Sequence, residues 1–219
     1  MRMRGPDDTP DGLPLPGSHG VDGVLRRRDY PLSCAFRSRR LRLQTLGYRH
    51  LLDLLRLGRE ARVTALLLDG HLDTVADAAG LVVWANRLYD THPGLGHWHA
   101  IDARGAFIGM FSLTPGADPD EVGIGARLLP SAWGRGYALE GAVVLCDHVF
   151  GRLAASRLSA LCDPRNAPVP HLLRRLGFHD SGAAEQYGRP ALRFVLPREA
   201  WHGLRPRARM RHDGRGVPR

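Results

Sequence analysis

A short loop with two glycines stands between a predicted strand and a predicted helix, and it constrains this chain more than any other segment. The strand covers 121–128, and the helix opens near Trp133 and runs to Phe150. Gly134 and Gly136 carry no side chain, so the atoms of a ligand can approach their backbone closely. The start of a helix offers unpaired N–H groups and the positive end of its dipole. The sequence therefore predicts a site for phosphate groups here.

The same loop narrows the class of ligand. Arg135 adds a cation that can reach a phosphate oxygen, which favours a ligand with a diphosphate. The dinucleotide fingerprint GxGxxG is incomplete, because Leu139 occupies its third glycine position. The GxxxxGK[ST] loop of nucleoside-triphosphate enzymes is excluded, because the chain contains no lysine. A turn that is shaped by glycines and binds nothing is the simpler alternative.

Hydrophobic spacing around this loop predicts one α/β domain with a mixed sheet. The domain is expected to cover 36–201, and the segments 1–35 and 202–219, poor in large apolar residues, are predicted to be loosely ordered extensions. Gly123 and Gly125 indicate a bulge in their strand, or a close approach of another backbone or a ligand. Strands are expected at 39–46, 97–101, 106–113, 121–128, 158–162 and 191–196, helices at 48–57, 73–89, 133–150 and 171–176, and either at 61–68.

The net charge of +9 is concentrated at one end of the sequence. Between 203 and 219, six arginines accompany one acid, Asp213, which gives this tail a net charge of +5. Arginine tails bind phosphates without sequence preference, so a weak contact with RNA or the ribosome is one prediction. A solvated extension is the other, because no aromatic residue follows Trp201 to stack on bases.

Several classes of protein are disfavoured by what the sequence lacks. It has no run of about 20 apolar residues, so no membrane span is expected. Its first residues are not followed by the apolar segment of a secretory signal. Cys34, Cys146 and Cys162 are widely spaced and form no CxxC pair, which argues against a disulfide scaffold and a zinc site. We expect a cytoplasmic protein without a metal, as a monomer or homodimer.

Four segments at matching distances resemble the GNAT N-acetyltransferase superfamily. Leu-Leu-Pro at 128–130 and Trp-Gly-Arg-Gly-Tyr-Ala-Leu-Glu at 133–140 resemble its acetyl-CoA-binding segment, in the form typical of the RimJ/RimL-like branch of ribosomal-protein-alanine acetyltransferases. Asp-Pro-Arg-Asn at 163–166 resembles the asparagine loop of that branch. Residues 173–178 resemble its glycine–phenylalanine ending, and 39–43 resemble its opening strand. The resemblance spans 38–197.

The resemblance implies a GNAT-like α/β (α+β) fold, in which a mixed, mostly antiparallel central sheet is flanked by helices and a splayed strand pair holds the cofactor. It implies transfer of an acetyl group from acetyl-CoA to a primary amine, which is a protein N-terminus or a small molecule. The residues that it implies in acetyl-CoA binding are Arg127, Leu128, Leu129, Trp133, Gly134, Arg135, Gly136, Tyr137, Ala138, Leu139 and Asn166, the last through pantetheine.

Three residues are candidates for deprotonating or orienting the amine. Glu121 begins the strand that leads to the glycine loop, where many relatives carry an acid; a solvated charge is the alternative. His97 and His99 lie two residues apart, so they share one face of a predicted strand and could line the acceptor site. Two histidines of the surface or core are the alternative, and no third ligand accompanies them for a metal.

Two departures from the family keep other functions open. Val169 stands where the branch usually has serine, and Leu173 stands where other relatives carry tyrosine. The usual proton donors for the leaving thiolate are therefore missing. One alternative is a non-catalytic acyl-CoA-binding domain that acts as a sensor or scaffold, and another is an RNA-associated protein that uses the arginine tail.

Overall fold

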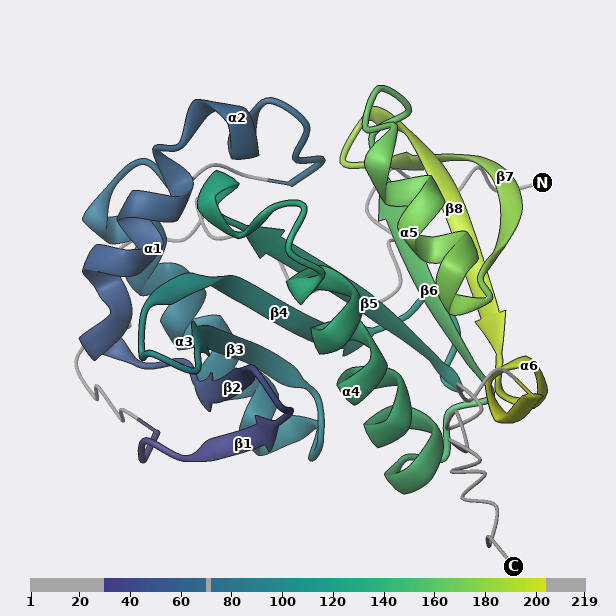
Figure 1. Cartoon of the computed structure of the whole chain (residues 1–219), viewed down its shortest axis with the longest axis horizontal. Helices are drawn as coiled ribbons and strands as arrows, with labels where there is room; N and C mark the ends of the chain where they lie inside the picture. Colours follow the sequence, from purple (N-terminus) through teal and green to yellow (C-terminus); the bar gives the residue numbers. More distant parts are fainter. Residues whose placement is uncertain (1–29, 70–71, 204–219) are drawn as a thin grey trace, which may run out of the picture.

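The computed structural model describes residues 30–69 and 72–203, and an eight-stranded sheet forms its centre (Figure 1). Its strands lie in the order β1-β2-β3-β4-β5-β6-β8-β7, and all neighbours pair antiparallel except β5 and β6. The predicted mixed, mostly antiparallel sheet is thus confirmed. The strands are β1 Cys34–Arg37, β2 Leu41–Thr45, β3 Gly96–Asp102, β4 Phe107–Pro115, β5 Glu121–Leu128, β6 Arg157–Cys162, β7 His179–Gln186 and β8 Arg189–Pro197.

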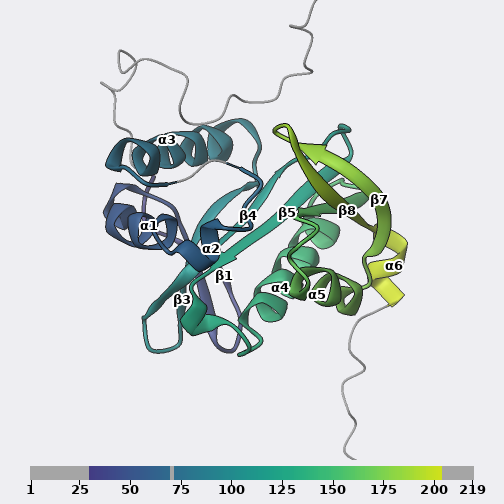
Figure 2. The same cartoon turned by 90° about the horizontal axis from the view of Figure 1, so that it is seen from above.

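Helices cover both faces of the sheet (Figure 2). One face carries α1 (Leu51–Gly58), α2 (Ala61–Thr64) and α3 (Val75–Thr91), and the other carries α4 (Tyr137–Arg152) and α5 (Pro168–Leu176). The remaining helices are α6 (Arg198–Gly203) after β8 and the 3-10 turns η2 (Tyr48–His50) and η3 (Pro130–Ala132).

The parallel pair β5–β6 opens along its length. The two strands pair only from Glu121, Val122 and Gly123 to Arg157, Leu158 and Ser159. Beyond these residues they diverge, so the two halves of the sheet form a V whose arms are β5 and β6 (Figure 1). The resemblance implied such a splayed pair, and the structure contains it. The divergence leaves one edge of β5 without a strand partner beyond Gly123.

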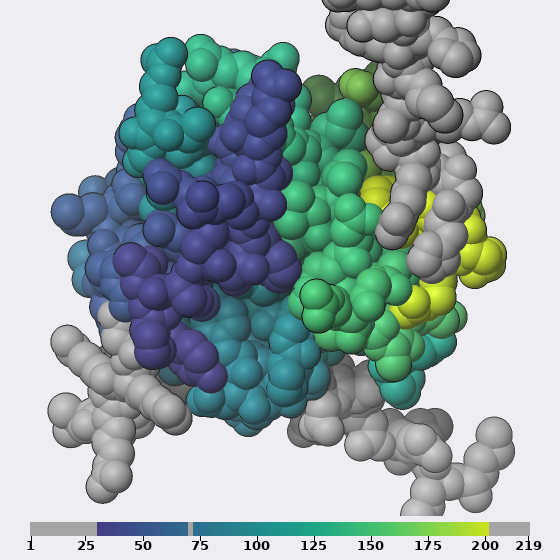
Figure 3. Space-filling view, turned by 60° about the horizontal axis from the view of Figure 1, so that its bottom comes forward, coloured from purple at the N-terminus to yellow at the C-terminus, as the bar shows by residue number. Residues whose placement is uncertain are grey.

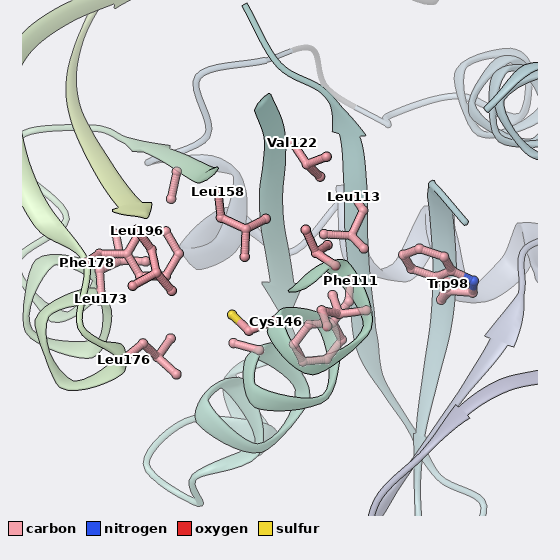
Figure 4. Packing of buried hydrophobic residues seen from close by; sticks show 14 of the residues in the cluster. Trp98, Phe111, Leu113, Val122, Cys146, Leu158, Leu173, Leu176, Phe178 and Leu196 are labelled. Carbon is pink, nitrogen blue, oxygen red and sulfur yellow. The ribbon is translucent and has the colours of Figure 1, made fainter. Parts of the chain in front are cut away.

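The larger core lies between the sheet and helices α4 and α5 (Figure 4). Its centre includes Phe111 of β4, Cys146 of α4 and Leu158 of β6. Gly141 lets α4 approach the sheet, because a Cβ atom there would lie 2.3 Å from the Phe111 ring. Burial of these apolar side chains fixes α4, and therefore also fixes the loop from which it starts.

Most predicted elements are confirmed, and two strands were missed. β1 and β7 are exposed edge strands, and β7 has no alternation of apolar residues, so hydrophobic period could not reveal it. The feature that could have indicated β7 is the Tyr187-Gly188 pair between β7 and β8. Both residues have positive φ angles, which fit a tight hairpin turn. The sheet begins at Cys34 and α6 reaches Gly203, slightly outside the predicted 36–201. The predictions for 1–29 and 204–219 lie outside the described residues.

Candidate functional site

The glycine loop has the geometry that its sequence predicted. Gly134 and Gly136 have φ angles of 69° and 77°, in the left-handed region that favours glycine. A Cβ atom on Gly134 would meet nothing within 4 Å, so that position borders open space. The first intrahelical bond of α4 runs from Glu140 N–H to Gly136 C=O, 3.0 Å. The first N–H groups of α4 therefore have no partner within the helix, and they are those of Tyr137, Ala138 and Leu139.

Arg40, at the start of β2, braces this loop. Its guanidinium donates to the Glu140 carboxylate at 2.6 Å and to the Arg135 carbonyl at 2.9 Å. It also lies over the Tyr137 ring, 4.9 Å from the centroid, which places that ring between Arg40 and the core. The contact between Arg40 and Glu140 was not predicted from the sequence, although both residues lie in segments that resemble the family, 39–43 and 133–140.

Glu140 holds the other side of the brace. Its carboxylate also accepts hydrogen bonds from the Ser38 hydroxyl at 2.7 Å and the Arg40 backbone N–H at 2.9 Å. Burial raises the pKa of Glu140, but these donors outweigh burial and the net pKa is lowered. The carboxylate is therefore an anion at neutral pH, and it ties the start of β2 to the first turn of α4.

Replacing Glu140 by glutamine should loosen this connection. We expect Glu140→Gln to lower the free energy of unfolding by about 1–2 kcal/mol, because charged hydrogen bonds in a half-buried setting become neutral ones. Urea unfolding at pH 7 measures the change. Glu185→Gln on exposed β7 is the matched control and should change stability by less than about 0.5 kcal/mol. Equal effects of the two substitutions on stability would contradict the role of Glu140 in connecting β2 to α4.

The end of β5 presents one backbone donor toward the gap between β5 and β6. Leu129 N–H donates to Ile108 C=O at 2.9 Å, which points it toward β4. Leu128 C=O instead accepts from the indole N–H of Trp133 at 2.7 Å. Because strand groups alternate between the two sides, the Leu128 N–H faces away from β4, and those of Arg127 and Leu129 face it. Of the backbone N–H groups of Arg127, Leu128 and Leu129, only that of Leu128 therefore points away from β4 and into the gap.

Residues 60–69, called the crossing segment below, span the open side of the V. Arg62 lies over the Trp133 ring at 4.9 Å, and Asp69 forms an ion pair with Arg127 of β5. From the other arm, Arg165 donates to Ala65 C=O at 3.4 Å and Arg189 donates to Leu67 C=O. Figure 1 shows the segment reaching from α2 to the β7–β8 turn. It therefore borders the gap on the face opposite α4.

Glu121 lies far from the glycine loop, at the opposite end of β5. Seven residue steps at about 3.4 Å place its Cα about 24 Å from that of Leu128. Its buried carboxylate accepts from Arg157 at 2.9 Å and from Arg193 at 2.6 Å. Burial raises its pKa, but the two arginines and Ser159 outweigh burial and lower the pKa to about 2. In place of the predicted base, we assign Glu121 to an ion-pair cluster that joins β5, β6 and β8.

His97 and His99 share one face of β3, as predicted, but both lie in the layer beneath α1 and α3. Burial, with a contribution from Arg127, lowers the pKa of His97 to about 3, so its ring is neutral. Its ring packs against Trp84 at 4.4 Å, and neither nitrogen has a hydrogen-bond partner among the described residues. Burial also lowers the pKa of His99, against the influence of Asp53 at 2.8 Å. The structure favours the alternative of core histidines.

The strand glycines form no bulge. Gly125 faces Ser112 and Gly123 faces Thr114 in an unbroken β4–β5 register. A Cβ atom on Gly125 would lie 2.7 Å from Ser112 Oγ, and one on Gly123 would lie 2.8 Å from Thr114 Oγ1. The glycines therefore make room for two hydroxyl groups on the face that bears the crossing segment. This half-buried polar row borders the gap.

Asn166 lies on the other arm of the V, in the loop between β6 and α5. The N-cap of α5 is Ala167, so Asn166 does not cap that helix. Its side-chain amide forms no hydrogen bond among residues 30–69 and 72–203, and it is half-buried. It is therefore free to bind a ligand that lies in the gap.

Within residues 30–69 and 72–203, no group of three His, Cys, Asp or Glu side chains could hold a metal ion. No helix in the same ranges is both long enough and apolar enough to cross a membrane.

The sequence matches a family model and is similar to a curated relative. The model is described as an acetyltransferase (GNAT) domain, and it matches residues 40–179. The relative is the FsC-acetyl coenzyme A-N(2)-transacetylase of Aspergillus fumigatus, 28% identical over 127 residues. The match covers 54% of this chain and 54% of that protein, so the chain spans about half the length of the curated relative that it matches.

Solved structures share the fold. A GNAT-family acetyltransferase from Bacillus anthracis has a TM-score of 0.63 at 16% identity, covering 74% of this chain and 98% of its own. RimJ from Mycobacterium smegmatis, solved with CoA-disulfide, has a TM-score of 0.62 at 21% identity, covering 75% and 87%. RimL, a ribosomal L7/L12 α-N-protein acetyltransferase solved with coenzyme A, has a TM-score of 0.64 at 17% identity, covering 74% and 97%. At these identities the likeness shows the fold alone.

Proposed function

Because this chain belongs to the acetyltransferase (GNAT) family, we propose that it moves an acetyl group from acetyl-CoA to a primary amine. One observation carries the proposal: a loop with left-handed Gly134 and Gly136 opens α4 directly after β5 separates from β6. This arrangement joins an anion site to a gap that can hold an extended chain. Acetyl-CoA has both parts, a diphosphate and a pantetheine arm.

The residues fit this donor. The N–H groups at the start of α4 would bind the diphosphate, and Arg40 supplies a fixed cation beside them. In the gap, Leu128 N–H would bind the thioester carbonyl and the Asn166 amide would bind pantetheine. Bound acetyl-CoA supplies a thioester that is reactive toward amines. Trp133 positions the strand end through its bond to Leu128, and Arg135 contributes charge.

None of the residues that were predicted to deprotonate the amine titrates near neutral pH. Glu121 is held as an anion by two arginines, and His97 stays neutral because it is buried. The amine must therefore arrive neutral. An α-amine has a pKa of about 7.7–8.0 and a lysine side chain about 10.4, so far more of an α-amine is neutral at physiological pH. We therefore propose an α-amine as acceptor.

The descriptions of two similar proteins are consistent with an α-amine as acceptor. One neighbour is described as an α-N-protein acetyltransferase, and the curated relative as an N(2)-transacetylase. The crossing segment borders the gap where the acceptor would enter, which favours a small molecule or the end of a chain over a folded surface. A protein N-terminus and a small α-amine both meet these requirements.

A CoA-release assay tests the proposal. The panel contains peptides with a free N-terminus, the same peptides N-acetylated but with one lysine, free amino acids and polyamines. We expect release with free α-amines and at least about 100-fold less with lysine alone at pH 7.5. Binding of acetyl-CoA without release from any amine would instead support the sensor or scaffold function that Val169 and Leu173 left open.

The dependence of rate on pH should follow the acceptor. We expect kcat/KM for the amine to rise about tenfold per pH unit below the pKa of the amine and to level above it. The inflection should move when an acceptor of different pKa is used, and His97→Gln should leave the shape of the profile unchanged. An inflection near pH 6.5 that persists with every acceptor and disappears in His97→Gln would identify His97 as the base.

Contact of the arginine tail with RNA remains a prediction, because 204–219 lie outside the described residues. Deletion of 204–219 should reduce retention on RNA at low salt more than at high salt, since phosphate contacts are screened. Acetyl transfer to a small amine should be unchanged. If retention is equal with and without the tail, the tail has no such role.

A further inference from the structure

Four arginines line a hollow at the β1–β2 turn, beside the glycine loop. They are Arg37, Arg39, Arg40 and Arg42, and Ala103 of the β3–β4 turn also lines the hollow. Strand pairing explains the location: Leu41 pairs with Asp102, and Gly109 pairs with Leu128. The β1–β2 turn, the β3–β4 turn and the end of β5 therefore lie at one end of the sheet.

Three of these arginines have no acidic partner among residues 30–69 and 72–203. Arg40 pairs with Glu140, but Arg37, Arg39 and Arg42 take part in no ion pair within residues 30–69 and 72–203. The Arg42 Nε atom is buried and lacks a hydrogen-bond partner in those same ranges. Like charges so close together repel one another, so the cluster would be stabilised by an anion.

The hollow adjoins the proposed diphosphate site through Arg40. One guanidinium nitrogen of Arg40 donates to Arg135 C=O, and another lies 3.3 Å from the place of a Cβ on Gly136. In the space-filling view, the purple residues of β1 and β2 lie against the green region that contains α4 (Figure 3). One ligand could therefore contact both the glycine loop and the arginine cluster.

We propose that this arginine cluster binds the ribose 3′-phosphate of the CoA donor. The inference rests on the proposed function. In CoA the diphosphate and the 3′-phosphate are separated by a single ribose, so a ligand anchored at the loop presents its second phosphate group nearby. Arginine guanidinium groups match phosphate geometry and retain their charge at all physiological pH values. The cluster would thereby distinguish CoA from 3′-dephospho-CoA.

Calorimetric titration of the full chain with CoA and with 3′-dephospho-CoA tests this. At low salt we expect CoA to bind at least about 10-fold more tightly, as one charge-assisted contact predicts. The double variant Arg37→Gln/Arg39→Gln, at two exposed positions, should reduce that ratio to less than about 3-fold and leave the affinity for 3′-dephospho-CoA unchanged. Higher salt should reduce the ratio in the unmodified chain.

Arg87→Gln on α3, on the other face of the sheet, is the matched control and should keep the full ratio. Arg42→Gln provides a second variant with the same expected direction. Equal affinities for the two nucleotides in the unmodified chain, or an unchanged ratio in both variants, would overturn the inference while the proposed function stands. Failure of both nucleotides to bind would instead overturn the donor site itself.

Discussion

Gly136→Asp should weaken acetyl-CoA binding by at least about 100-fold while the protein still folds. The residue has a φ of 77° at the N-cap of α4, and the substitution places a carboxylate where the N–H groups would meet the diphosphate. Like charges at close range in a partly desolvated site cost several kcal/mol, and each 1.4 kcal/mol is a factor of ten in affinity. Calorimetric titration with acetyl-CoA measures the change.

Two variants separate charge from backbone strain. Gly136→Asn has nearly the shape of Gly136→Asp without its charge, and asparagine tolerates the left-handed region, so its loss should be much smaller. Gly182→Asp places the same side chain at another glycine with positive φ and open space around it, on β7. It should leave acetyl-CoA affinity unchanged. Unaltered affinity in folded Gly136→Asp would exclude the glycine loop as the donor site.

Glu121→Gln should lower the free energy of unfolding by about 2–3 kcal/mol at pH 7. The substitution removes the charge that neutralises Arg157 and Arg193, and breaking a buried pair costs about 3–5 kcal/mol before allowance for exposure. The exposed parts of the two arginines and the remaining contact of Arg157 with Asp118 reduce that cost. Urea unfolding measures the loss, and turnover per folded molecule should stay within about threefold of the original.

The effect should disappear in acid. Because the pKa of Glu121 falls from 4.5 to about 2 in the folded protein, its stabilisation is present above pH 4.5 and is lost as the pH drops toward 2. The stability difference between the original chain and Glu121→Gln should therefore shrink below pH 4.5. Glu185→Gln on exposed β7 should show no comparable difference at any pH. A drop in kcat of about 100-fold or more with normal stability would restore Glu121 as the base.

Local signals predicted the elements that carry them. The helix over 75–91 begins at Thr74, whose hydroxyl accepts from Asp77 N–H while the Asp77 carboxylate accepts from Thr74 N–H. β5 was predicted with its observed bounds, since the wider turn before it and Pro130 after it mark its ends. β7 escaped because an edge strand needs no apolar face, and its stability comes from pairing with β8.

The glycine loop was more predictable than the crossing segment. Gly134 and Gly136 occur within a continuous segment, so their left-handed backbone and the helix start could be inferred from neighbours in sequence. The crossing segment could not be inferred, because its contacts join residues that are distant in the chain. Arg189, for example, reaches Leu67, and Arg165 reaches Ala65. The periodic spacing of apolar residues cannot predict such long-range polar contacts.

The sequence by itself determined the strand–loop–helix unit and the mixed sheet, because these depend on glycine conformation and on local periodicity. It also indicated the family, through the resemblance of four segments to the motifs of that family. Only the tertiary structure decided the state of the polar side chains. Glu121, at a strand start, had the pattern of a solvated charge or a base, yet packing of β6 and β8 surrounds it with Arg157 and Arg193. The pKa of a carboxylate or an imidazole depends on burial and on nearby charges, and three-dimensional packing sets both.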